Sequence, residues 1–208
     1  MFTHIRAASL TLSGVLTRSF IADPDLANLF DSGLGGSAVV SLATPDGMDT
    51  AGEVGLSVWL YRLVRDEQLL NRPPQRLPPD MLRRHPIPVR AHFLMTPIIT
   101  GNANTPAPET EQLVIGRVLQ TFSDEPLISG PDLAGSYQGT SVELGVRLES
   151  LGLDEMSRIW EGLERSYKLS ISYEVSVVVI GSALQPTLAP PVKVVRPLVS
   201  IGAPGGGG

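Results

Sequence analysis

The chain has 208 residues, 42% of them hydrophobic and 18% charged, which is enough for one domain with a substantial core. Its formal net charge of −5 argues against a nucleic-acid-binding protein, because such proteins usually carry a basic surface. It has no cysteine, which excludes disulfides and thiolate metal sites. It also has no apolar run near the roughly 18 residues that a membrane span requires, so we expect cytoplasmic synthesis without membrane insertion.

The first part of the chain predicts a helix followed by turns. Apolar residues recur at steps of three and four over residues 3–20, which indicates an amphipathic helix that ends before Pro24. Residues 32–36 are rich in glycine but lack the spacing of a phosphate-binding loop, so we interpret them as a plain loop. A short strand is expected over residues 37–42, and a turn at the Pro-Asp-Gly sequence that begins with Pro45.

Two largely apolar strands are predicted over residues 55–64 and 87–96. The intervening segment 71–86 exceeds the about 12 to 15 residues beyond which loops are usually functional or disordered, so it is a candidate contact loop. A solvated loop without any partner remains an equal alternative. The candidate contact residues in this segment are Arg72, Arg76, Arg83 and Arg84.

The second half of the chain alternates helices with strands. Thr110 is placed to cap a helix that ends before Pro126. Strict alternation predicts a strand with one wet face over 142–149, and helical spacing predicts a short helix over 152–163 with Trp160 inward. The longest alternation, over residues 168–180, predicts a strand with one apolar face and one half-solvated polar face.

The search for chemistry finds no established catalytic motif. The three histidines, His4, His85 and His92, lack the spacing of metal ligands. His92 shares a strand face with Arg90, so a role as a base is open, but we favour a hydrogen-bonded structural histidine. Glu174 on the polar face of the long strand could also be a base, but such a residue is what any half-solvated strand would show. We therefore predict no catalytic, metal or cofactor site.

Four stretches in consistent order over residues 1–183 resemble one known family. The strands LSVWLYRLV and IPVRAHFLMT, the helix EQLVIGRVLQTFSDEPLI and the block LDEMSRIWEGLERSYKLSISYEVSVVVI resemble the cap, or tail-terminator, family of phage-tail-like contractile injection systems. The residues that match the motifs of that family are Tyr61, Arg62, His92, Gly116, Pro126, Trp160, Tyr173 and Glu174.

The resemblance implies a fold and a function. The expected fold is mixed α/β (α+β), with a mainly antiparallel sheet of long strands backed by helices, in a single cap domain over residues 1–183. The expected function is structural, without enzymatic activity or cofactor. Such subunits form a homo-hexameric ring that closes the tube and sheath opposite the baseplate, so the implied partners are other copies of the chain and the sheath and inner-tube subunits.

Residues 184–208 form a proline- and glycine-rich arm beyond the predicted domain. Within it, residues 192–195 are β-like, so Val192 and Val194 are candidate contacts for strand addition on a neighbour. A disordered tail is an equal alternative. For the whole chain, the alternative functions are a monomeric ligand-binding or adaptor module and, more remotely, a hydrolase whose residues meet only in the fold.

Overall fold

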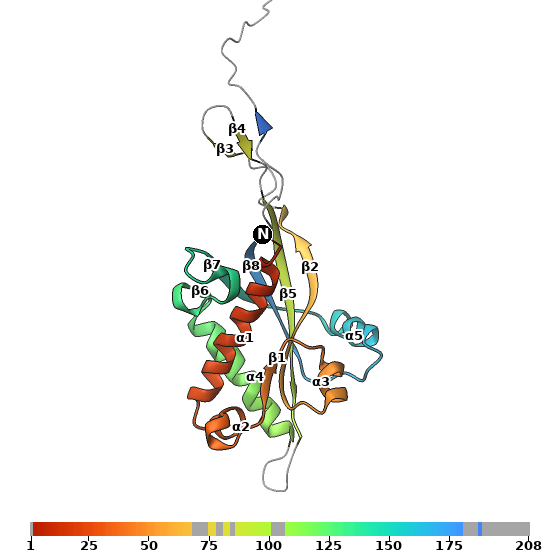
Figure 1. Ribbon diagram of the computed structural model, residues 1–208. Coiled ribbons are helices and arrows are strands. Elements are labelled where there is room, and N and C mark those ends of the chain that lie inside the picture. Colours follow the sequence, from red (N-terminus) through yellow and green to blue (C-terminus); the bar gives the residue numbers. More distant parts are fainter. Residues whose placement is uncertain are drawn as a thin grey trace, which may run out of the picture.

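The main body of the protein is a six-stranded sheet with the order β1-β2-β5-β8-β7-β6 (Figure 1). The computed structural model describes residues 2–67, 75–77, 81–83, 86–100, 107–180 and 187–188. Neighbouring strands are antiparallel except for the parallel pair β1 and β2, which confirms the predicted mixed fold with a mainly antiparallel sheet. The strands of this sheet are β1 (Val39–Ser41), β2 (Gly55–Arg65), β5 (Ile87–Ile98), β6 (Leu127–Ser129), β7 (Glu143–Glu149) and β8 (Ile171–Ile180).

Helices cover both faces of this sheet, with α1 and α4 on one side and α3 and α5 on the other (Figure 1). The helices predicted over 3–20 and 152–163 are confirmed, with nearly the predicted ends. Within the part of the chain that the structure describes, none of the helices is long and apolar enough to cross a membrane. The helices are α1 (His4–Ala22), α2 (Ala27–Phe30), α3 (Pro45–Ala51), α4 (Ala107–Asp124) and α5 (Leu153–Gly162).

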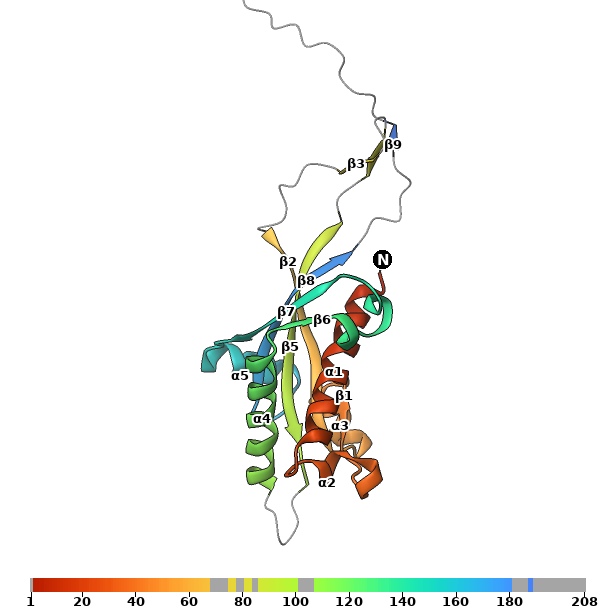
Figure 2. The ribbon, with the colours of Figure 1, turned by 90° about the vertical axis from the view of Figure 1, so that its left-hand side faces the viewer.

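The main core lies between the sheet and helices α1 and α4, and Figure 2 views the molecule from this side. Leu12 of α1 and Val118 of α4 are fully buried in the same cluster as Phe93 of β5. The ring of Phe122 meets that of Tyr173 edge to face, with the two ring centroids 5.0 Å apart. Since each such side chain contributes about 1.5 to 3 kcal/mol when buried, this layer is a main source of stability.

A smaller core cluster lies on the opposite face of the sheet, under α5. Trp160 and Met156 of α5 are buried against Leu94 of β5, and Trp160 is only 2% exposed. The Glu155 carboxylate accepts a hydrogen bond of 3.1 Å from the backbone N–H of Gly152, which stabilises the first turn of the helix. The predicted inward orientation of Trp160 is confirmed.

The predicted turn at Pro45 is wrong, because the Pro-Asp-Gly sequence forms the start of helix α3. The hydroxyl of Thr44 accepts a hydrogen bond of 3.0 Å from the backbone N–H of Gly47. Proline is also well suited to the first helical position, where its missing N–H costs nothing. The N-cap and this proline together outweigh the turn preference of the tripeptide.

Two predicted element boundaries are also wrong. Helix α4 begins at Ala107, so Thr110 lies inside the helix rather than at its cap, and Pro108 is tolerated because it sits in the first turn. Strand β8 begins at Ile171, later than predicted. The hydroxyl of Ser170 donates a hydrogen bond of 2.9 Å to the carbonyl two residues before it, and such local bonds compete with strand pairing.

The segment predicted to be a long contact loop contains two short strands instead. These are β3 (Gln75–Leu77) and β4 (Met81–Arg83), and β4 also pairs with β9 (Thr187–Leu188) from the predicted arm. Arg76 therefore lies on β3 and Arg83 on β4, opposite Leu82 and Gln75 respectively. The remaining predicted contacts in the segment and arm lie outside the described residues, and they are Arg72, Arg84, Val192 and Val194.

Candidate functional site

A row of polar side chains crosses four strands on the face of the sheet that also carries α5. In the strand pairing, Arg62 of β2 lies opposite His92 of β5, and His92 lies opposite Glu174 of β8. Glu174 in turn lies opposite Arg147 of β7. Directly opposed residues of antiparallel strands point to the same face, so these four side chains are neighbours.

The polar face of β8 is buried, which corrects the prediction of a half-solvated face. Ser172 is 1% exposed and Glu174 is 8% exposed. The physical reason is that polar side chains from the adjacent strands cover them. Buried polar groups require hydrogen-bond partners, and here the neighbouring strands β5 and β7 provide them.

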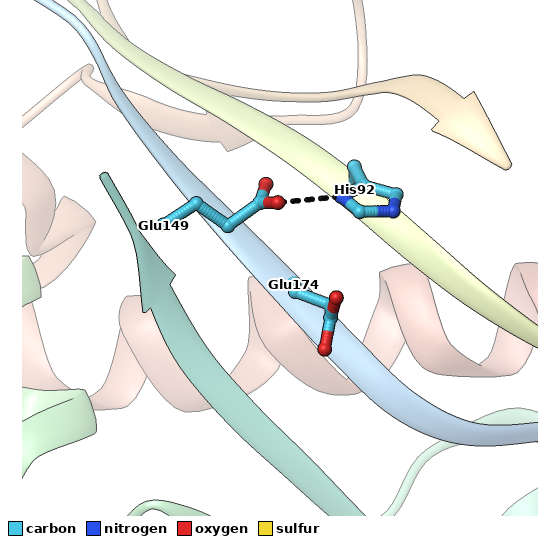
Figure 3. Close-up of side chains that lie close together, drawn as sticks. All are labelled: His92, Glu149 and Glu174. Atoms are coloured by element: carbon cyan, nitrogen blue, oxygen red, sulfur yellow. Dashed lines mark hydrogen bonds and ion pairs between the residues drawn. The ribbon is translucent and has the colours of Figure 1, made fainter. Parts of the chain in front are cut away.

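Glu149, at the end of β7, is the centre of this hydrogen-bond network. Its Oε1 lies 2.9 Å from Nδ1 of His92, as Figure 3 shows. Its Oε2 accepts a hydrogen bond of 2.6 Å from the hydroxyl of Ser172 and one of 3.4 Å from that of Tyr61. Burial alone would raise the pKa of Glu149, but the hydrogen bonds from Ser172 and His92 outweigh it, so the pKa is lowered.

Two arginines compensate the negative charge of Glu174. Its Oε1 accepts a hydrogen bond of 3.0 Å from Arg147, and its Oε2 one of 3.5 Å from Arg90. Arg90 also donates a shorter hydrogen bond, of 3.2 Å, to Asp66. The side chain of Glu174 is 10% exposed whereas that of Arg147 is 70% exposed, so a buried carboxylate is paired with a guanidinium at the surface.

The network contains the residue types of a hydrolytic triad, but the contacts are in the wrong order for one. In a triad the imidazole lies between the acid and the nucleophile, and it accepts the proton of the nucleophile. Here the carboxylate of Glu149 lies between Ser172 and His92, so the imidazole cannot activate the serine. This arrangement does not support the hydrolase alternative.

His92, Glu149 and Glu174 each offer one ligand atom, and these three atoms lie within 4.8 Å of one another. All three residues line a pocket of about 420 Å³, which also has Arg62, Val64, Arg65, Glu67 and Arg90 in its wall. Nε2 of His92 is buried and has no hydrogen-bond partner among the described residues. The arrangement therefore combines a polar network that leaves one buried imidazole nitrogen unpaired with three residues of metal-ligand type beside an open pocket.

The structure brings together only part of the predicted residue set. Tyr61, Arg62, His92 and Glu174 meet around the pocket, by direct contact or as part of its wall. The other four lie elsewhere in the fold: Gly116 on α4, Pro126 just after α4, Trp160 on α5, and Tyr173 on the opposite face of the sheet.

Sequence reasoning missed Glu149, Ser172 and Arg147 as members of the network. Glu149 is opposite Ser172 in the pairing of β7 with β8. The alternating pattern of each strand placed both on polar faces, but it did not give the register between the strands. That register is the signal that identifies them.

Comparison with known proteins connects this fold to one family. The profile of the family described as the Pvc16 N-terminal domain matches residues 10–193. A search of curated proteins gives no match.

Two solved structures are similar to this chain. One is the sheath/tube terminator, in the extended state, of the extracellular contractile injection system PVC, with 17% identity, a TM-score of 0.52, and coverage of 88% of this chain and 64% of that chain. The other is the tube terminating cap of the anti-feeding prophage, with 18% identity, a TM-score of 0.52, and coverage of 87% and 62%. The chain thus spans less than two thirds of each, and at these identities the likeness shows a shared fold. Together with the family match over most of the sequence, it confirms the predicted cap, or terminator, resemblance: the chain belongs to the Pvc16 N-terminal domain family.

Proposed function

We propose that this protein is a structural cap subunit, which forms a homo-hexameric ring and closes the tube and sheath of a contractile particle opposite the baseplate. The observation that carries this proposal is the family match over residues 10–193 together with the likeness to a sheath/tube terminator and a tube terminating cap. Its partners are then other copies of itself and the sheath and inner-tube subunits. It works without catalysis or cofactor, in a particle that assembles after cytoplasmic synthesis.

In this proposal the ring is built head to tail through the two edges of the main sheet. The outermost strands are β1 and β6, where Val39 is 43% exposed and Leu127 is 62% exposed. Joining the β1 edge of one copy to the β6 edge of the next uses two different surfaces. A contact of that kind closes into a ring when the rotation between copies fits a whole turn.

The terminating action follows from the same geometry. A ring that matches the symmetry of tube and sheath offers them a binding surface on one side. In this proposal its other side offers them no such surface, so polymerisation stops.

In this proposal, residues 1–183 form the cap domain, and the arm 184–208 and the segment 71–86 contact a neighbouring cap or sheath subunit. Part of the arm, β9, pairs with β4 of the same chain, which connects the two contact segments. Truncation after Ala183 tests this role. The main sheet should still fold, since its strands end at Ile180, while attachment to sheath should weaken. Full attachment by the truncated protein would make the arm dispensable.

Two measurements test the cap function itself. Size-exclusion chromatography with light scattering should give a hexamer mass, and particles from a deletion strain should lack a ring at the end opposite the baseplate. A monodisperse monomer at high concentration, combined with normal particle ends in the deletion strain, would contradict the proposal. A monomeric binding or adaptor module predicts that combined result.

A further inference from the structure

We propose that His92, Glu149 and Glu174 form a binding site for a divalent transition-metal ion of the zinc type. The three side chains come from the adjacent strands β5, β7 and β8 and converge on one face of the sheet (Figure 3). An ion held there would link these three strands directly.

The ligand set selects the class of metal. One imidazole and two carboxylates form a mixed nitrogen and oxygen set, which suits zinc and neighbouring transition metals. Magnesium and calcium prefer sites made of oxygen atoms alone. We therefore expect selective binding of zinc over magnesium.

The ligand atoms lie close together, and small side-chain movements bring them to metal-binding distance. Nδ1 of His92 and Oε1 of Glu149 are 2.9 Å apart, and all three ligand atoms lie within 4.8 Å of one another. Two ligands about 2.1 Å from a tetrahedral zinc ion are separated by roughly 3.4 Å, so His92 and Glu149 have to open slightly and Glu174 has to close in from β8. The metal then replaces the proton between Nδ1 and Oε1.

Metal binding at Nδ1 of His92 requires the imidazole proton to move to Nε2. In the metal-free hydrogen bond, Nδ1 carries the proton, because the Glu149 carboxylate can only accept. Nε2 is buried without a partner among the described residues, so the proton breaks no hydrogen bond there but leaves an unpaired N–H, a cost that the metal–ligand bonds have to exceed. The hydroxyls of Ser172 and Tyr61 hold Oε2 of Glu149 and orient the carboxylate, as outer partners of metal ligands usually do.

The arginines that compensate Glu174 can be displaced. Arg147 has a side chain 70% exposed, so it can move into solvent when a cation replaces it. Arg90 contacts Glu174 at 3.5 Å but Asp66 at 3.2 Å, so its stronger contact survives. The competition between cation and Arg147 predicts that removal of Arg147 strengthens metal binding.

The site is reachable from solvent. The three ligand residues line the pocket of about 420 Å³ described above. An ion can therefore enter without separation of the strands.

Titration calorimetry on the full chain, freed of metal with a chelator, tests the proposal with zinc chloride as the probe. We expect one zinc ion per chain, no competition by magnesium, and at least a tenfold loss of affinity in His92→Gln and in Glu174→Gln. Arg147→Met should bind zinc several-fold more tightly. The matched controls are His4→Gln on α1 and Arg158→Met on α5, which should bind like the parent.

A thermal melt gives a second readout, because a ligand that binds only the folded state raises Tm, here by about 5 to 11 °C at a hundredfold excess over Kd. Circular dichroism checks that each variant is folded. If His92→Gln or Glu174→Gln does not fold, Arg147→Met still tests the proposal, because it keeps all three ligand residues. No zinc binding by the parent, equal binding by His92→Gln, or no gain in Arg147→Met would overturn the proposal.

Discussion

Glu174 and Arg147 face each other across β8 and β7, with 3.0 Å between the carboxylate and the guanidinium, yet they differ sharply in exposure. The side chain of Glu174 is 10% exposed and that of Arg147 is 70% exposed. Substitution of the exposed partner of an ion pair changes the free energy of unfolding little, whereas substitution of the buried partner changes it strongly. The two ends of this ion pair should therefore respond differently to substitution.

Glu174→Gln should lower the free energy of unfolding by about 1 to 3 kcal/mol, because it replaces the buried charged acceptor of Arg147 and Arg90 with a neutral amide. Arg147→Gln should cost at most about 1 kcal/mol, since its side chain is mostly in solvent. Urea unfolding of both variants measures the difference. Equal costs for the two substitutions would contradict the asymmetry.

Trp160→Ala should destabilise the fold by about 3 to 5 kcal/mol, because Trp160 is 2% exposed in the cluster under α5 and its removal opens a cavity. Trp160→Phe should cost clearly less. The indole N–H has no partner among the described residues, so phenylalanine loses volume but no hydrogen bond. Thermal melts of both variants test this.

A different result would reassign Trp160. If Trp160→Ala melts like the parent but fails to cap particles, the residue belongs to an interface between subunits. Its assignment to the core would then be wrong.

Tyr137→Phe should leave the stability at neutral pH unchanged or slightly higher, because the Tyr137 hydroxyl is buried with no partner among the described residues. Burial raises the pKa of Tyr137 to about 12. Above pH 10 the unfolded chain therefore loses this proton while the folded chain keeps it, and stability falls as pH rises. At pH 12 this group should cost about 2 kcal/mol.

Denaturant unfolding from pH 8 to 12 measures this slope, which should be shallower in Tyr137→Phe than in the parent. Tyr167→Phe is the matched control, since Tyr167 is 51% exposed. An identical slope in the parent and in Tyr137→Phe would mean that Tyr137 ionises without opening the fold.

Leu127→Lys should weaken self-association without changing Tm, because Leu127 lies on the edge strand β6 and is 62% exposed. A charge at the centre of an apolar contact between copies is costly when it is buried. Leu153→Lys on α5 is the control, since Leu153 is 74% exposed away from either edge strand. Light scattering over a range of concentrations compares them, and an intact hexamer in Leu127→Lys would exclude the β6 edge as the contact.

The sequence by itself determined most of the elements of the main sheet. Strands β7 and β8 and helices α1 and α5 follow from local periods of hydrophobicity, and strands β2 and β5 from largely apolar runs, all of which are properties of short stretches of chain. The family was also readable from motifs in these same stretches, as the match over residues 10–193 confirms. Boundaries were less secure, because caps such as that of Thr44 act through single hydrogen bonds.

Only the tertiary structure decided the polar site. Residues 92, 149 and 174 lie far apart in the chain, and no local period records which strand pairs with which or in what register. The order β5-β8-β7 places His92 opposite Glu174 and Glu149 opposite Ser172, so the three side chains meet on one face of the sheet. Their burial follows from this arrangement, because each polar side chain is shielded by partners on the neighbouring strands.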